Sequence, residues 1–182
     1  MRIIAGKARG RRLRSPPGKA TRPTSDRVRE ALFSILGSMQ DLRVVDGFAG
    51  TGALGLEALS RGAATCTFFE IHRKAREAIA ENIDRVGVAD RATLIPRAFD
   101  EAWPTLREPV DLIFLDPPYG SELAPAALAA IATTPELVAG DARIVWESST
   151  DEEVLALPGW DLTKDRSYGT TRIAIYDRAI DP

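Results

Sequence analysis

The chain has 182 residues, of which 45% are apolar and 27% are charged, as in a soluble globular protein with one domain and a sizeable core. No apolar stretch approaches the ~20 residues that span a membrane, and the N-terminus lacks the apolar segment of a secretory signal, so a cytoplasmic location is expected. The single cysteine, Cys66, and the single histidine, His72, exclude an internal disulfide and a metal cluster of these residue types, and no metal site is expected.

Charge is distributed unevenly, although the formal net charge is only −2. Residues 1–29 hold ten basic side chains and one acid, Asp26, whereas the rest of the chain holds 14 basic and 25 acidic residues. This separation predicts that the first segment meets a polyanion while the body does not. The alternative is a solvated basic tail.

The N-terminal part of the chain shows several local signals. A short apolar start, residues 3–5, is followed by Gly6 and Gly10, which is compatible with two short extended pieces in a hairpin. Residues 15–18, Ser-Pro-Pro-Gly, predict a turn or linker. A helix is predicted over residues 26–36, because capping residues precede apolar side chains at the i, i+3, i+4, i+7 spacing.

Residues 42–55, Leu-Arg-Val-Val-Asp-Gly-Phe-Ala-Gly-Thr-Gly-Ala-Leu-Gly, predict a strand, a tight glycine loop and a helix in succession. Gly50 permits the turn, Gly52 lets a ligand approach the backbone, and Gly55 lets the helix pack closely on the strand. Asp46 distinguishes between ligands, because its carboxylate would repel the pyrophosphate of NAD and stabilise the sulfonium and ammonium of S-adenosylmethionine. The acid therefore favours S-adenosylmethionine over NAD. The alternative is that the glycines only form a tight strand–helix turn.

The next strand is predicted over residues 64–69 and ends in Glu70. This acid lies eighteen residues beyond Gly52, the kind of separation at which a carboxylate binds the two ribose hydroxyls of a nucleoside. The alternative is an exposed acid at the end of a strand. Residues 72–86 predict a helix and residues 92–96 a third strand.

Arg97, Ala98 and Phe99 follow the third strand, at the sheet edge where parallel sheets bind ligands. Phe99 could cover an adenine ring or belong to the core. A short helix is predicted over residues 101–107.

The most strand-like run, residues 110–115, predicts a central strand that stops at Asp116, because Pro117 and Pro118 cannot continue it. Residues 125–132 predict a helix and residues 142–146 a strand. A closing antiparallel pair is predicted over residues 160–164 and 172–176, connected by residues 165–171. Strands alternating with helices predict an α/β fold with a mostly parallel sheet and a closing hairpin.

One kind of catalysis would use the four residues that follow this strand: Asp116, Pro117, Pro118 and Tyr119. An exocyclic amine of a nucleobase is a poor nucleophile, because its lone pair is delocalised into the ring. The carboxylate of Asp116 and the carbonyl of Pro117 can accept the two amine hydrogens and turn the lone pair toward a methyl donor. Tyr119 offers a flat face on which an extruded base can stack. The alternative is a proline-rich turn after an acid.

Four segments together resemble the bacterial RsmD family of methyltransferases. Asp46-Gly-Phe-Ala-Gly-Thr-Gly and Asp116-Pro-Pro-Tyr are shared by many amino-methyltransferases that use S-adenosylmethionine. The more specific segments are Met-Arg-Ile-Ile-Ala-Gly-Lys-x-Arg-Gly-Arg-Arg-Leu at residues 1–13 and Thr-Arg-Pro-Thr-Ser-Asp-Arg-Val-Arg-Glu-Ala-Leu-Phe-Ser-Ile-Leu at residues 21–36. The resemblance covers essentially the whole chain.

That family implies methylation of the 2-amino group of a guanine in small-subunit ribosomal RNA, on a Rossmann-like class I methyltransferase fold. It implies a basic extension over residues 1–25 that binds ribosomal RNA or a small-subunit assembly particle, and a methyltransferase domain over residues 26–182, in a protein expected to be a monomer. The expected catalytic residues are Asp116, Pro117, Pro118 and Tyr119. The expected cofactor residues are Asp46, Phe48, Ala49, Gly50, Gly52, Gly55, Glu70, Ile71, Ala98 and Phe99. The expected RNA-binding residues are Arg2, Lys7, Arg9, Arg11, Arg12, Arg14 and Arg22.

One position departs from the pattern. Related methyltransferases often have Asp or Asn where Arg97 stands, and Arg97 cannot accept a hydrogen bond from the adenine amine. Backbone groups near Ala98 and Phe99 are therefore expected to contact adenine. Three alternative functions remain open: an adenine 6-amino methyltransferase acting on DNA, a non-catalytic RNA-binding assembly protein and, on weaker grounds, an NAD oxidoreductase.

Overall fold

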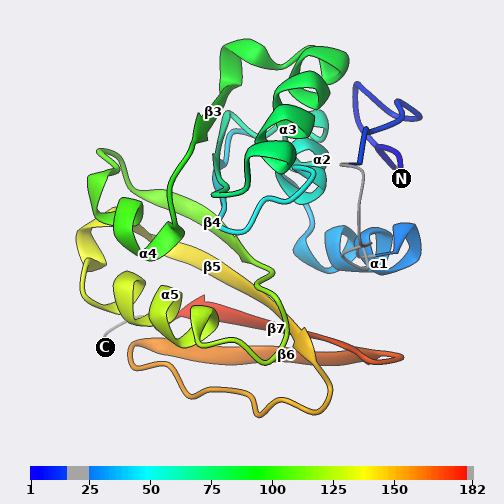
Figure 1. The fold of residues 1–182 in the computed structure, drawn as a ribbon. Coiled ribbons are helices and arrows are strands. Elements are labelled where there is room, and N and C mark those ends of the chain that lie inside the picture. Colours follow the sequence, from blue (N-terminus) through cyan, green and yellow to red (C-terminus); the bar gives the residue numbers. More distant parts are fainter. Residues whose placement is uncertain (16–24, 180–182) are drawn as a thin grey trace.

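The structure, a computed structural model, describes residues 1–15 and 25–179. Within these residues one seven-stranded sheet has the strand order β3-β2-β1-β4-β5-β7-β6 (Figure 1). Its first five strands run parallel, and β7 lies antiparallel to both β5 and β6. The strands are β1 (Arg43–Asp46), β2 (Thr65–Phe69), β3 (Ala92–Ile95), β4 (Val110–Leu115), β5 (Val138–Ser149), β6 (Trp160–Tyr168) and β7 (Thr171–Arg178). The helices are α1 (Asp26–Leu36), α2 (Ala53–Ser60), α3 (Arg73–Val86), α4 (Phe99–Ala102) and α5 (Leu123–Ala132), with 3-10 turns η1 (Ala89–Arg91), η2 (Trp103–Thr105) and η3 (Pro135–Leu137).

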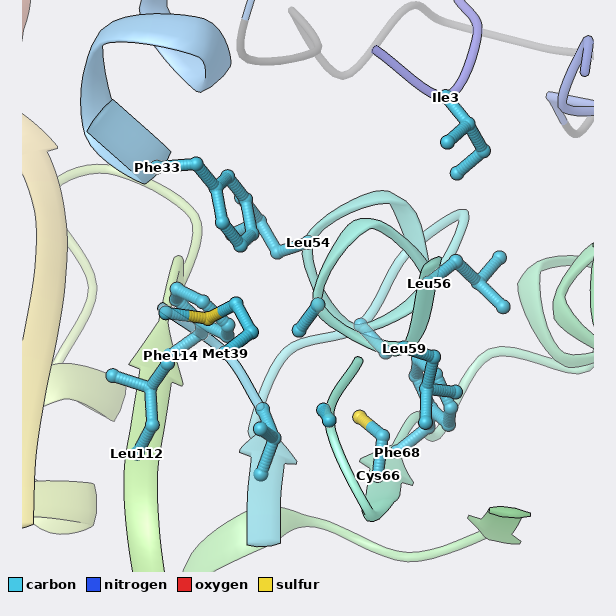
Figure 2. Close-up of a cluster of buried hydrophobic side chains, with 14 of the residues drawn as sticks. Ile3, Phe33, Met39, Leu54, Leu56, Leu59, Cys66, Phe68, Leu112 and Phe114 are labelled. Atoms are coloured by element: carbon cyan, nitrogen blue, oxygen red, sulfur yellow. The ribbon is translucent and has the colours of Figure 1, made fainter. Parts of the chain in front are cut away.

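Helices cover both faces of the sheet and divide the core into two layers (Figure 1). Successive side chains of a strand point to opposite faces, so Val44 packs in the layer with α1, α2 and α3, and Val45 in the layer with α4 and α5. Figure 2 shows Phe33 of α1 beside Leu54 at the start of α2. The ring of Phe33 lies 5.7 Å from that of Phe114, centroid to centroid. Helix α1 is therefore fixed near the carboxyl end of β4.

The N-terminal segment, residues 1–15, packs onto the rest of the described chain. Arg2 and Arg12 form an antiparallel bridge, in line with the predicted hairpin, and the chain between them turns back on itself. Three of its side chains are buried in the same core layer as α2: Ile3, Ala8 and Leu13. Figure 2 shows Ile3 pointing toward α2. The basic segment is thus held at a defined place.

The predicted elements differ from the observed ones mainly in length. Strand β5 extends well beyond the predicted residues 142–146 at both ends. The predicted connection over residues 165–171 is wrong, because β6 continues to Tyr168 and the hairpin turns through Gly169 and Thr170. Helix α5 begins two residues before Pro125, which the first helical turn tolerates because its N–H needs no partner there. In place of one helix over residues 101–107 there are the short helix α4 and the turn η2.

Over residues 1–15 and 25–179, none of the helices has both the length and the apolar character needed to cross a bilayer.

Candidate active site

Four acidic side chains follow the carboxyl ends of neighbouring parallel strands. Glu70 follows β2, Asp46 ends β1, Asp116 follows β4, and Glu147 lies near the end of β5. Carboxyl ends of parallel strands meet at one edge of a sheet, where ligands of open α/β folds bind. The strand order therefore gathers four carboxyl groups at one edge.

A pocket of about 460 Å³ opens at this edge. This volume falls within the range of small-molecule sites. All four predicted catalytic residues line it, as do eight of the ten predicted cofactor residues: Asp46, Phe48, Ala49, Gly50, Glu70, Ile71, Ala98 and Phe99. The structure thus brings together groups that lie up to 73 positions apart in the sequence, as Asp46 and Tyr119 do.

Two predicted cofactor residues do not reach the pocket wall. Gly52 has a left-handed backbone and caps the N-terminus of α2. Gly55 faces β2, and a Cβ atom on it would lie 2.4 Å from Cε1 of Phe68 and 2.5 Å from Sγ of Cys66. The close helix–strand packing predicted for Gly55 is confirmed, but direct ligand contact by either glycine has no support in the structure.

Glu70 is held by hydrogen bonds from two loops, the one that follows β1 and its own loop after β2. One carboxylate oxygen accepts a 2.9 Å hydrogen bond from the Gly50 N–H, and the other accepts a 2.7 Å hydrogen bond from the His72 N–H. A carboxylate has about four acceptor sites, so both oxygens can accept further hydrogen bonds. Glu70 can therefore bind two adjacent hydroxyls without rearranging the loop.

Asp46 is a buried acid without a cationic partner among the described residues. Its side chain accepts a 3.0 Å hydrogen bond from the Gly55 N–H. Burial raises the pKa of Asp46 from 3.8 to about 7; the Gly55 hydrogen bond opposes this rise, and the nearby Glu70 adds to it. A positively charged ligand would stabilise the ionised form, so the pocket is suited to a cation.

Asp116 lines the pocket, and a second acid, Glu147, lies close to it behind the lining residues. Burial raises the pKa of Asp116 well above its usual range, and the charges of Glu147 and Asp46 raise it further. The hydroxyl of Tyr119 donates to Glu147 over 3.2 Å and lies 3.2 Å from the Thr171 hydroxyl. Burial, together with the acids Glu147 and Asp116, raises the pKa of Tyr119 to about 12, although the Thr171 hydrogen bond lowers it, so the phenol is neutral at pH 7.

Sequence reasoning assigned no role to Glu147. The signal was present, because it follows the predicted strand 142–146 as Glu70 and Asp116 follow theirs. Glu147 comes close to Tyr119 because β5 pairs with β4, with Leu115 opposite Trp146. The order of strands in the sheet was not predicted, so the contact with Tyr119 was not foreseen.

The region predicted for adenine has a largely buried floor. Phe99 is only 1% exposed, stacks on Trp103 with ring centroids 5.2 Å apart and meets Phe69 edge-on at 5.3 Å. It is therefore a core residue whose edge borders the pocket. Arg97 also lines the pocket and donates weakly to the Glu101 carbonyl over 3.4 Å.

Six of the seven predicted RNA-binding residues are described by the structure; they lie within residues 1–15, and none of them lines the pocket. Arg2 pairs with Asp26 over 3.8 Å, Arg14 pairs with Glu81, and Arg11 donates to the carbonyl of Arg85. The other three are exposed and form no ion pair with another described residue: Lys7, Arg9 and Arg12. Arg22 lies outside the described residues.

Contacts with α2 fix this segment. Glu57 is fully buried and accepts the N–H of Ile4 over 2.8 Å and that of Ala5 over 2.9 Å. The Ser60 hydroxyl accepts from the Ala8 N–H over 3.0 Å and donates to the Ala5 carbonyl over 2.6 Å. The exposed cations are thus presented on a segment that is held against α2, and the Lys7 N–H itself donates to the Ser60 carbonyl at the C-terminal end of that helix.

The sheet order, the glycine loop and the acidic pocket define a class I methyltransferase fold. The same fold is found in TrmN from Thermus thermophilus, with a TM-score of 0.67 at 22% identity over 83% of this chain and 48% of that one. This chain also aligns with the structure of the putative methyltransferase yhhF from Escherichia coli, with a TM-score of 0.86 at 34% identity over 100% of this chain and 99% of that chain.

Residues 1–177 match the family model described as Conserved hypothetical protein 95, and the chain belongs to this family, the RsmD family that its motifs resemble. A relative named Ribosomal RNA small subunit methyltransferase D from Escherichia coli is 33% identical over 98% of this chain and 90% of its own length. The protein of the same name from Haemophilus influenzae is 32% identical over 97% of this chain and 93% of its own length.

Proposed function

We propose that this protein transfers a methyl group from S-adenosylmethionine to the exocyclic 2-amino group of a guanine in small-subunit ribosomal RNA. The observation that carries the proposal is that Asp46 and the segment Asp116–Tyr119 open into one pocket. The names of the relatives support ribosomal RNA as the substrate. The exposed cations of the N-terminal segment support a polyanionic substrate.

The pocket fits S-adenosylmethionine in charge and in hydrogen-bonding groups. We propose that Glu70 binds the ribose hydroxyls and that backbone groups at Ala98 and Phe99, which line the same pocket, contact adenine. Asp46 is buried and pairs with no cation among the described residues, and the sulfonium and ammonium of the donor would provide that positive charge. When bound, S-adenosylmethionine supplies an electrophilic methyl group on sulfur.

Asp116 and Pro117 prepare the amine for attack. The Asp116 carboxylate and the Pro117 carbonyl accept the two amine hydrogens and orient the nitrogen lone pair. As the N–C bond forms and the S–C bond breaks, the nitrogen becomes cationic, and the negative charge of Asp116 stabilises it. The raised pKa of Asp116 suits it to take the proton that the methylated amine then loses.

Tyr119 provides the surface for the base. Its side chain is 45% exposed, so a ring of an extruded guanine can stack on it. The hydrogen bond to Glu147 and the contact with Thr171 fix the phenol at the mouth of the pocket. We infer that Glu147 acts as a positioning residue for Tyr119.

The N-terminal segment is proposed to bind the RNA around the target base. Lys7, Arg9 and Arg12 are exposed and form no ion pair with another described residue, so they can contact phosphates, which position a nucleic acid without reading its sequence. The boundary of a separate extension at residue 25 stays a prediction.

Two alternative functions use parts of the same arrangement. The same active-site chemistry would also methylate an adenine 6-amino group in DNA, and the basic segment alone would suffice for a non-catalytic RNA-binding protein.

The deciding experiment is to map where a radiolabelled methyl group is incorporated. RNA and DNA from cells lacking the protein are incubated with the purified enzyme and labelled S-adenosylmethionine, and the modified nucleosides are identified. We expect label in 2-methylguanosine of small-subunit ribosomal RNA. Label in 6-methyladenine of DNA would support the first alternative, and donor binding without transfer to any substrate the second. Free RNA and assembling particles are compared in parallel.

A further inference from the structure

Arg29 is a fully enclosed cation at the edge of the pocket. It lies on α1, has no exposed surface and borders the cavity. Its Nη2 donates to the Arg2 carbonyl over 2.6 Å and to Asp26 over 2.7 Å. The atoms Nε and Nη1 have no hydrogen-bond partner among the described residues. Three of its five N–H groups therefore have no acceptor within residues 1–15 and 25–179.

This arrangement is costly unless an acceptor is supplied. A guanidinium is always charged in proteins, and a buried polar group without a partner destabilises the fold. Asp26 compensates the charge only in part, because it is 46% exposed and also lies 3.8 Å from Arg2. Arg29 is thus in a position that a further anion, bound in the pocket, would complete.

The position of Arg29 shows which end of the pocket it lines. It lies one helical turn before Phe33, which packs against Phe114 of β4 and beside Leu54 of α2 (Figure 2). Glu70 follows β2, on the opposite side of the central strand β1. A nucleoside bound through Glu70 therefore leaves the opposite end of the pocket, toward α1 and β4, for the rest of the donor.

We propose that Arg29 binds the carboxylate of the methionine part of S-adenosylmethionine. This inference rests on the proposed function. The donor carries one anionic group, at the end remote from its nucleoside, and a guanidinium with free N–H groups is a strong partner for a carboxylate. Asp46 then faces the cationic groups and Arg29 the anionic one, so the pocket matches both charges of the amino-acid end.

The test compares two ligands that differ only in this carboxylate. Binding of S-adenosylhomocysteine and of its decarboxylated analogue is measured by calorimetry for the unmodified protein, Arg29→Met, Arg29→Lys and the control Arg27→Met. Arg27 is an exposed arginine on the same helix. We expect the unmodified protein and Arg27→Met to prefer the carboxylate-bearing ligand by about 10- to 100-fold, as for a charged hydrogen bond. Arg29→Met should bind both ligands equally, and Arg29→Lys should keep part of the preference.

Equal affinity of the unmodified protein for the two ligands would overturn the proposal, and so would a preference that persists in Arg29→Met. If Arg29→Met keeps the ligand preference of the unmodified protein but binds RNA more weakly, Arg29 contacts an RNA phosphate instead. If neither ligand binds the unmodified protein, the proposed function itself fails. The preference is a ratio measured within one folded variant, so a general loss of stability does not imitate the expected result. If Arg29→Met does not fold, Arg29→Lys decides the proposal, because a preference in that variant equal to the one of the unmodified protein would overturn it.

Discussion

Asn82 and Thr51 are joined by a 2.9 Å hydrogen bond from the Asn82 amide to the Thr51 carbonyl. The same amide nitrogen donates to the Arg14 carbonyl over 2.9 Å, and the amide oxygen accepts the Arg14 N–H over 2.7 Å. Thr51 lines the pocket, and Arg14 belongs to the N-terminal segment. One fully buried side chain of α3 therefore connects the basic segment to the glycine loop.

The anchoring of that segment can be tested at two glycines. Gly6 and Gly10 have nearly the same left-handed backbone, with φ of 82° and 84°. A Cβ atom at Gly6 would lie 1.9 Å from the Ser60 carbonyl oxygen, whereas nothing lies within 4 Å of one at Gly10. Both Ala variants incur about 1–2 kcal/mol of backbone strain, and Gly6→Ala about 1–3 kcal/mol more.

The free energy of unfolding of both variants is measured by urea denaturation. Equal losses for Gly6→Ala and Gly10→Ala would show that the packing of Gly6 on α2 contributes nothing. Faster amide hydrogen exchange in residues 3–13 of Gly6→Ala alone would show that the segment has lifted from α2.

Asp116→Ala is expected to lower the rate of methyl transfer about 10²- to 10³-fold, the range for removing one preorganised group from an active site. The affinity for S-adenosylmethionine should change far less, because Asp116 acts on the amine. Single-turnover kinetics and equilibrium binding separate the two quantities, and Glu153→Ala, at an exposed acid of the β5–β6 connection, is the control. Equal losses in rate and in binding would remove Asp116 from the catalytic role.

Donor binding should depend on pH through Asp46. The pKa of this group is about 7 in the free protein because it is buried, so binding of a cation below that pH must displace a proton. We expect affinity to rise with pH between about 5.5 and about 7, by at most about tenfold per pH unit, and then to level off. Calorimetry across this range tests this expectation, with Asp46→Asn as the variant that should bind weakly and lose this component of the pH dependence.

The same group should make stability fall with pH. A carboxyl whose pKa is raised on folding contributes stability that is complete below 3.8 and lost as the pH rises through about 7. Asn can still accept the Gly55 hydrogen bond without a charge. Asp46→Asn should therefore unfold like the unmodified protein at pH 4 and be more stable at pH 8, by up to about 4 kcal/mol. The difference between the two proteins isolates Asp46 from Asp116, whose pKa is also raised. A constant difference across this range would contradict the prediction.

Neutralising Lys7, Arg9 and Arg12 to Gln should weaken RNA binding at low salt. Each phosphate that the protein no longer neutralises reduces the slope of log K against log salt by about 0.7 to 0.9. If each of the three side chains contacts one phosphate, the triple variant should lower the slope by about 2 to 3. A matched variant neutralises three exposed cations elsewhere: Arg107, Lys164 and Arg166. If both variants change the slope equally, the N-terminal segment has no special role.

The sequence predicted best where the local chemistry is unambiguous. Apolar runs that end in an acid located β1, β2 and β4 and their carboxyl groups, because buried parallel strands are almost continuously apolar. The length of β6 was missed, because seven of its nine residues are exposed and its polar second half resembles a loop. That strand is defined by pairing with β7, a long-range contact that local patterns do not show.

Arg29 was not predicted as a site residue for a different reason. A charged residue in a helix normally faces water, and nothing in its neighbours indicates full burial. Its location depends on Arg2 and Asp26 closing over it, and on α1 packing near β4. Local sequence patterns do not show contacts of this kind, which join segments that are far apart in the chain.

The concentration of carboxyl groups at the pocket also bears on product release. Transfer of the methyl group turns a cationic sulfonium into a neutral thioether, which loses its attraction to Asp46 and Asp116. The spent donor is then held mainly by its nucleoside and amino-acid ends, so it should leave more readily than fresh donor does. At equal concentrations the site should therefore hold more S-adenosylmethionine than S-adenosylhomocysteine.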